Sequence, residues 1–160
     1  MKAEEGCELP RRSTTGSAAY DFFAPEDIHL VPGQWTEFGT GVSFDGTEKL
    51  IMPMREYDPW TIKFSKVRFE VSNWVAVMYP RSGLGFRNMV RFANTTGIID
   101  KDYREEIRCK MTADVDVTIP KGKAYAQMMF VPFLILRDEV VPTEERKGGF
   151  GSTDRKEGQE

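Results

Sequence analysis

The stretch that decides the fold is NWVAVMYPRSGLG, residues 73–85, in which valines alternate with other apolar residues until a proline ends the run. Such a period of two predicts a half-buried strand, and the proline with the following glycines predicts a tight turn. Similar short segments recur between 14 glycines and 9 prolines. They are residues 28–31, 41–44, 106–111, 115–119 and 124–136. This pattern predicts an all-β sandwich, jelly roll or barrel, with a short helix around residues 82–90.

The composition limits the class of protein. The 160 residues are 40% hydrophobic, with 22 Lys and Arg against 25 Asp and Glu. This favours one folded domain and argues against a basic nucleic-acid binder. No apolar run approaches the ~18 residues of a membrane span, and the first residues do not resemble a secretion signal. We therefore expect a cytoplasmic protein with neither a nucleic-acid nor a membrane partner. Two cysteines and one histidine exclude a disulfide framework and a His-rich metal site.

Five local motifs could carry chemistry. They are GSAAYD (16–21), PRSGLG (80–85), NTTGIIDKDYREEI (94–107), GKAYAQMMF (122–130) and RKGGFGST (146–153). An Arg-Ser-Gly turn can bind an anion, and glycines around Phe150 let backbone amides converge on one. Asp100 follows an apolar pair and is a candidate general base. Each motif also has an ordinary structural interpretation, as a turn, a charged strand end, a buried glutamine with structural partners, or a solvated tail.

The order of the five motifs, from about residue 9 to residue 153, resembles that of the trimeric dUTP pyrophosphatases (dUTPases). The resemblance implies a β jelly roll assembled as a homotrimer, with sites at the subunit interfaces. Motifs one, two and four would come from one chain, motif three from a second and motif five from a third. The implied reaction is hydrolysis of dUTP to dUMP and pyrophosphate, which keeps uracil out of DNA and supplies dUMP for dTMP synthesis.

The resemblance also implies roles for single residues. Asp100 would activate the water that attacks the α-phosphorus. Tyr103 would lie under the deoxyribose and exclude a 2′-hydroxyl, and Phe150 would stack on uracil as the tail closes. Asp21 would orient Arg81 or a metal-bound water.

The other implied residues bind the base or the phosphates. Residues 94–108 would form a hairpin that reads uracil largely through its backbone and that includes Asn94, Gly97, Ile98, Ile99 and Arg108. The phosphates would be bound by Arg81, Ser82, Gly83, Gln127, Arg146, Gly151, Ser152 and Thr153. Mg²⁺ would be the cofactor, held mainly by the substrate phosphates without a direct protein ligand.

The sequence departs from the family pattern at five places, two of which are Glu105, where motif three has glycine, and Lys123-Ala124, where motif four has Asp-Arg. Ala19 stands where motif one has glycine, and Arg146 lies four residues before Phe150, where the family has five. Residues 49–73 are an insertion, which we expect to form an added hairpin with a turn at residues 55–59. We expect the β domain to span residues 1–142 and a flexible C-terminal lid to span residues 143–160.

Two other functions stay open at this point. A dCTP deaminase, or a bifunctional relative, shares the implied fold but needs a carboxylate at the cytosine ring, for which Glu105 or Glu106 is the nearby candidate. Motif three is closer to the dUTPase form. The second alternative is a regulatory protein whose insertion binds a protein partner.

Overall fold

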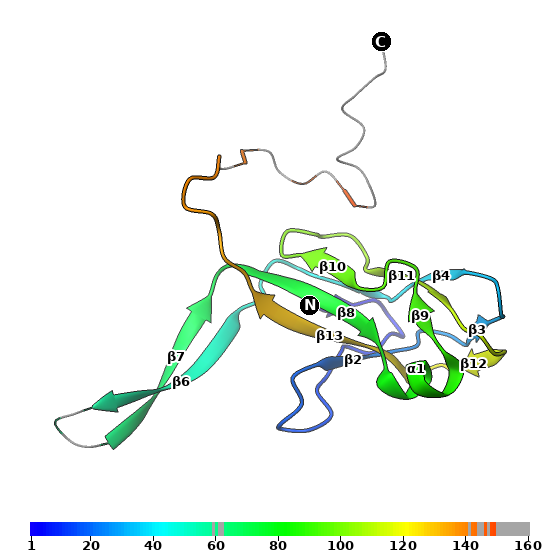
Figure 1. Cartoon of the computed structure of the whole chain (residues 1–160), viewed down its shortest axis with the longest axis horizontal. Helices are drawn as coiled ribbons and strands as arrows, with labels where there is room; N and C mark the ends of the chain where they lie inside the picture. Colours follow the sequence, from blue (N-terminus) through cyan, green and yellow to red (C-terminus); the bar gives the residue numbers. More distant parts are fainter. Residues whose placement is uncertain (59, 61–62, 141, 144–145, 147, 150–160) are drawn as a thin grey trace, which may run out of the picture.

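The computed structural model describes residues 1–58, 60, 63–140, 142–143, 146 and 148–149 (Figure 1). Within these residues the chain forms thirteen short strands and one helix, so the prediction of a mostly β fold is confirmed. The expected helix is α1 (Ser82–Asn88), which follows β8 directly. In this part of the chain, no helix has the length and apolar character needed to cross a membrane.

One antiparallel sheet, which we call the front sheet, organises the molecule. Its strand order is β10 (Gly97–Asp100), β8 (Trp74–Pro80), β13 (Ala124–Pro132) and β2 (Tyr20–Phe23). On β8 the side chains of Trp74, Ala76 and Met78 are buried, while the valines between them are half-buried. The period of two that is visible in the sequence therefore orients this strand over the core.

The remaining strands form smaller sheets. A three-stranded sheet has the order β4 (Thr36–Gly39), β11 (Arg108–Thr112) and β9 (Arg91–Phe92). Two pairs complete the body of the molecule, and their members are β12 (Val117–Ile119) with β3 (Ile28–Leu30), and β1 (Lys2–Ala3) with β5 (Val42–Ser43). Aromatic edges fill the core, where Phe44 meets Trp74 at 5.4 Å and Phe38 meets Tyr125 at the same centroid distance. Such edge-to-face pairs add to the stabilisation from burial alone.

Two expectations about strands were wrong. The last strand was expected to reach residue 136, but β13 ends at Pro132 and the following residues 133–136 are exposed, Leu134 to 99%. The motif-three segment was expected to form a hairpin. Instead β10 pairs with β8, and β11 pairs with β4 and β9. Strand partners depend on contacts between distant segments, which a local pattern does not contain.

The segment 49–73 forms a two-stranded antiparallel ribbon that projects from the body (Figure 1). Its strands are β6 (Leu50–Asp58) and β7 (Lys63–Val71). The turn expected at residues 55–59 was wrong as far as residue 58, because β6 continues through it; residue 59 lies outside the described residues. Ile51, Met52 and Phe69 are exposed on this ribbon.

A first prediction concerns Gly41, which joins β4 to β5 with a φ of +67°. A Cβ at this position would lie 2.3 Å from the Cys7 sulfur and 2.8 Å from its Cβ. We expect Gly41→Ala to lower the free energy of unfolding by about 2–4 kcal/mol, from backbone strain and overpacking together. Gly33→Ala is the matched control, because its φ is +77° but nothing lies within 4 Å. It should cost about 1 kcal/mol. Urea denaturation measures both changes, and an equal loss of unfolding free energy in the two variants would contradict a clash with Cys7.

Candidate active site

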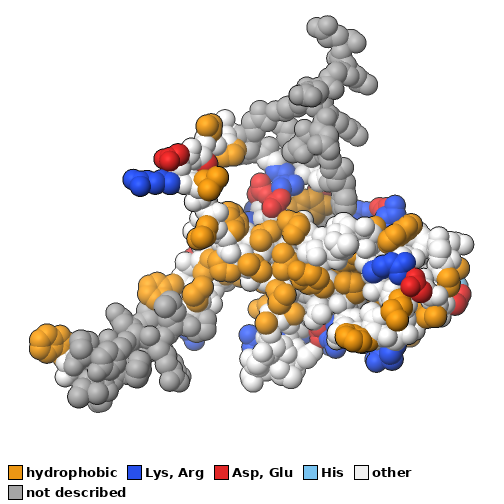
Figure 2. Space-filling model, in the orientation of Figure 1, with side chains coloured by type: hydrophobic (Ala, Val, Ile, Leu, Met, Phe, Trp, Pro, Cys, Tyr) orange, Lys and Arg blue, Asp and Glu red, His pale blue; other side chains and the backbone are white. Residues whose placement is uncertain are grey.

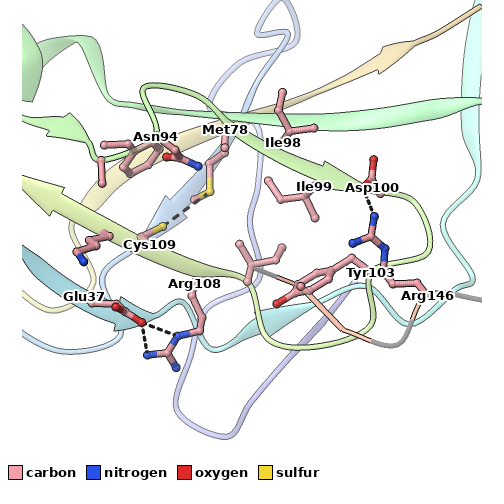
Figure 3. A pocket seen from close by; sticks show the side chains of 16 residues that line it. Glu37, Met78, Asn94, Ile98, Ile99, Asp100, Tyr103, Arg108, Cys109 and Arg146 are labelled. Carbon is pink, nitrogen blue, oxygen red and sulfur yellow. Dashed lines mark hydrogen bonds and ion pairs between the residues drawn. The ribbon is translucent and has the colours of Figure 1, made fainter. Parts of the chain in front are cut away.

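A first cavity of about 480 Å³ opens beside β10 (Figure 3). The predicted site residues that line it are Asn94, Gly97, Ile98, Ile99, Asp100, Tyr103, Arg108 and Arg146. All but Arg146 come from motif three or the residue that follows it. Gly149 of motif five lines it as well. Residues that the sequence did not single out also line the cavity, and they include Glu37, Met78, Phe92, Cys109 and Lys110. The apolar walls and few polar groups suit a flat heterocycle.

Asp100 lies at one end of the first cavity (Figure 3). It is the last residue of β10, and pairing with Val75 of β8 fixes its backbone. Its carboxylate is half-exposed and forms an ion pair with the Arg146 guanidinium. The same guanidinium donates from Nε to an Asp102 carboxylate oxygen at 2.9 Å. One arginine of motif five thus bridges two acids of motif three within a single chain.

Tyr103 forms the wall next to Asp100. Its side chain is buried, and its hydroxyl donates a hydrogen bond to the Glu106 carbonyl at 3.1 Å. Burial, aided by the charge of Glu105, raises the pKa of this hydroxyl, so it stays a neutral donor. Gly149 lies against the ring, since a Cβ there would be 2.8 Å from a ring carbon. The tail therefore approaches Tyr103 at a point where only glycine fits.

The opposite end of the first cavity carries a second ion pair (Figure 3). Arg108 donates from Nε and Nη2 to one Glu37 carboxylate oxygen, at 3.2 and 3.1 Å. On the same side of the cavity lies the buried Cys109 thiol, in contact with the Met78 sulfur at 3.9 Å. Burial raises the pKa of Cys109 to about 12, which keeps this thiol protonated and inert as a nucleophile at neutral pH.

A second cavity of about 350 Å³ brings motifs one, two and four together. Its lining residues are Ser13, Ser17, Ala18, Ala19, Asp21, Arg81, Ser82, Gln127 and Met129. Asp21 is only 6% exposed and forms an ion pair with Arg81. Gln127 donates from its side-chain nitrogen to the Pro80 carbonyl at 3.2 Å. Gln127 therefore has the structural hydrogen-bond partner that the ordinary interpretation of motif four requires. Its side chain also lines the cavity.

The predicted residues are therefore divided between two cavities rather than gathered in one. Gly83 lines neither cavity, and a Cβ there would lie 3.0 Å from the Arg87 guanidinium. Arg146 lies on motif three of its own chain, whereas the resemblance implies that motifs three and five come from different chains. Four further predicted residues lie outside the described residues, namely Phe150, Gly151, Ser152 and Thr153.

These features define a small, mostly β protein with an apolar cavity of about 480 Å³ and a separate polar cavity around Arg81. Comparison with known proteins gives the family. The dUTPase family model matches residues 63–154. The deoxyuridine 5′-triphosphate nucleotidohydrolase of Lactococcus lactis is 32% identical over 92% of this chain and 89% of its own length. That of Hydrogenobaculum is 31% identical over 97% and 96%.

The fold agrees with this match. The solved dUTPase of Staphylococcus bacteriophage 80alpha superposes with a TM-score of 0.61 at 17% sequence identity, over 91% of this chain and 95% of that one. The chain belongs to the dUTPase family.

Proposed function

We propose that this protein is a dUTP diphosphatase that hydrolyses dUTP to dUMP and pyrophosphate. The observation that carries the proposal is the half-exposed Asp100 carboxylate at the end of a cavity of about 480 Å³, in a chain of the dUTPase family. In the cell the reaction would keep uracil out of DNA and supply dUMP for dTMP synthesis.

Asp100 would act as the general base. Its carboxylate takes a proton from a water, whose oxygen forms a bond to the α-phosphorus while the bond to the pyrophosphate oxygen breaks. The carboxylate is exposed enough to reach a water, and the β10–β8 ladder holds it in place. In the free protein the Arg146 ion pair orients the Asp100 carboxylate. Substrate phosphates would then draw Arg146 away from it.

Uracil would be read by the backbone of β10. In the described part of the chain, this strand lies at the edge of the front sheet and pairs only with β8. The backbone groups of Ile98 that point away from β8 can therefore bond a ligand. Uracil offers acceptor, donor and acceptor along one edge, which cytosine does not, so cytosine would leave buried groups unpaired. Tyr103 would support the deoxyribose and exclude a 2′-hydroxyl.

The second cavity would bind the triphosphate, through Arg81, Ser82 and Gln127. The Asp21 carboxylate in the second cavity fits Mg²⁺, which usually keeps several waters and is bound by one or two carboxylates and by substrate phosphates. Asp21 would hold the ion through a water, and the bound Mg²⁺ would neutralise phosphate charge in the transition state.

The active form would be a homotrimer. The front sheet is apolar on both faces, since Val75 and Val77 are half-buried on the side opposite the core. Apolar side chains gather over this sheet in the view of Figure 2. Residues 133–136 are all apolar and exposed. Surfaces of this kind are typical of protein–protein contacts, and a second copy would bring its own half-site to the first cavity.

The deaminase alternative is disfavoured by the position of its carboxylates. Neither Glu105 nor Glu106 lines the first cavity. Glu106 accepts a hydrogen bond from the Gly41 backbone at 2.7 Å and is thereby turned away from it. A partner-binding role for the ribbon of β6 and β7 stays a prediction, based on its exposed Ile51, Met52 and Phe69.

The test of the proposed function is a substrate comparison with purified protein. We expect pyrophosphate release from dUTP in Mg²⁺, with a kcat/KM at least about 100-fold above that for dCTP, dTTP or UTP. Chelation with EDTA should abolish most of the activity. Ammonia release from dCTP, or equal hydrolysis of all four nucleotides, would contradict the proposal.

A second experiment addresses Arg146. If its guanidinium moves from Asp100 to the phosphates, Arg146→Ala should lower kcat/KM for dUTP by about 10- to 100-fold. Arg137→Ala is a suitable control, because this exposed arginine lies earlier in the same C-terminal segment and outside both cavities. Equal activity of the two variants would remove Arg146 from the mechanism.

A further inference from the structure

The loop before motif one is held in a closed turn next to the second cavity. Backbone hydrogen bonds join Arg11 and Asp21 in both directions, at 2.9 and 3.3 Å. Within the loop, Thr14 and Ser17 bond each other reciprocally through side chain and backbone. The backbone of the loop is thus positioned by contacts that do not involve Ser13.

The Ser13 side chain is used differently. Its hydroxyl donates to Asp21 Oδ2 at 2.5 Å, across eight positions of sequence. The same Oδ2 atom accepts the ion pair from Arg81 Nη1. Two donors from two separate segments therefore converge on one oxygen of a carboxylate that is only 6% exposed.

This arrangement determines where Arg81 points. A carboxylate with a single partner can rotate about its Cβ–Cγ bond, whereas a second donor fixes its plane. A fixed Asp21 in turn fixes the Arg81 guanidinium. An arginine side chain otherwise loses about 2 kcal/mol of rotamer entropy when it is ordered on binding. A cation that is oriented before the ligand arrives binds that ligand more tightly, because the ordering cost has already been met.

We propose that Ser13 is a positioning residue of the phosphate site, which acts through Asp21 on Arg81. Ser13 lies outside the five motifs. Two other polar side chains of the second cavity have partners elsewhere, since Ser17 is bonded to Thr14 and Gln127 to the Pro80 carbonyl. The inference rests on the proposed function for its substrate, a nucleoside triphosphate, but the hydrogen-bond relay itself does not.

The first experiment measures turnover of dUTP by Ser13→Ala, Ser13→Thr and Thr15→Ala. Ser13→Ala should lower kcat/KM by about 10-fold, because a hydrogen bond to a charged group is lost. Ser13→Thr retains the hydroxyl and should restore the activity to within about threefold of the wild type. Thr15 is an exposed residue of the same loop outside the cavity, so Thr15→Ala should behave as the wild type. Thermal unfolding checks that all four proteins are folded at the assay temperature. Ser13→Ala should melt slightly lower than the others, because the buried Asp21 carboxylate loses one of its two side-chain donors.

The second experiment needs no hydrolysis and so separates this inference from the proposed function. Binding of inorganic tripolyphosphate is measured by calorimetry at low salt. The wild type should bind it, Ser13→Ala should bind about 10-fold more weakly, and Ser13→Thr should be close to the wild type. Equal affinities of the wild type and Ser13→Ala, a threonine variant as weak as the alanine variant, or no binding by the wild type would each overturn the inference. If the wild type does not hydrolyse dUTP but the three proteins show the expected order of tripolyphosphate affinities, only the substrate assignment is overturned.

Discussion

Asp100→Asn should lower kcat for dUTP by about 10³-fold and leave substrate affinity within about threefold. The amide occupies the same volume as the carboxylate but cannot accept the proton of the attacking water. The cavity walls, formed by residues such as Ile99 and Tyr103, do not change. Single-turnover kinetics give the chemical step, and titration with an α,β-imido analogue of dUTP gives the affinity.

Asp102→Asn is the matched control for this experiment. Asp102 carries the same charge, lies two residues further along the chain and shares the Arg146 guanidinium with Asp100. It does not line the first cavity. Its substitution should therefore lower kcat by less than about 10-fold, because only an exposed ion pair is lost. If both variants lose activity to the same extent, the role of Asp100 is to hold Arg146 rather than to activate water.

Arg81→Ala should have the second-largest effect, a loss of about 10²- to 10³-fold in kcat/KM. It removes the cation of the second cavity and leaves the buried Asp21 carboxylate with Ser13 as its remaining side-chain donor. A buried charge without its counterion is destabilising, so the melting temperature should fall as well. Steady-state kinetics and thermal unfolding report the two effects separately.

The double variant Asp21→Asn/Arg81→Ala distinguishes catalysis from stability. It removes the stranded charge, so the melting temperature should recover while the activity stays low. Arg81→Lys keeps the charge but loses the planar fork of donors, and it should restore only part of the activity. Full activity of the double variant would contradict a direct role of Arg81 with the phosphates, and full activity of Arg81→Lys would contradict the need for its planar fork.

Local patterns in the sequence predicted the elements whose structure depends on near neighbours. The alternation in residues 73–79 became β8, and the helix expected around residues 82–90 is α1, which begins at Ser82. In motif three, the buried Ile99 precedes the half-exposed Asp100 at the end of β10, while Ile98 is exposed. A side-chain period of two suffices for such statements.

The residues that form the walls of the first cavity could not be predicted from local sequence patterns. Glu37 and Cys109 reach the first cavity because β4 and β11 pair in one register, and Met78 reaches it because β10 pairs with β8. Each of these contacts joins segments far apart in the sequence. The local sequence around a residue does not specify its partner in a distant segment, so strand pairing is decided only when the whole core packs.

By itself, the sequence determined the β class, the five motifs with their order, and the chemistry that Asp100, Arg81 and Tyr103 can perform, since these follow from residue type and short spacing. The tertiary structure alone decided that the motifs occupy two cavities within one chain and that Arg146 bridges Asp100 and Asp102. It also decided that the Ser13 hydroxyl meets Arg81 on one oxygen of Asp21. Those arrangements depend on how separate strands and loops pack against one another, and hydrogen-bond geometry at that scale is a property of the folded chain.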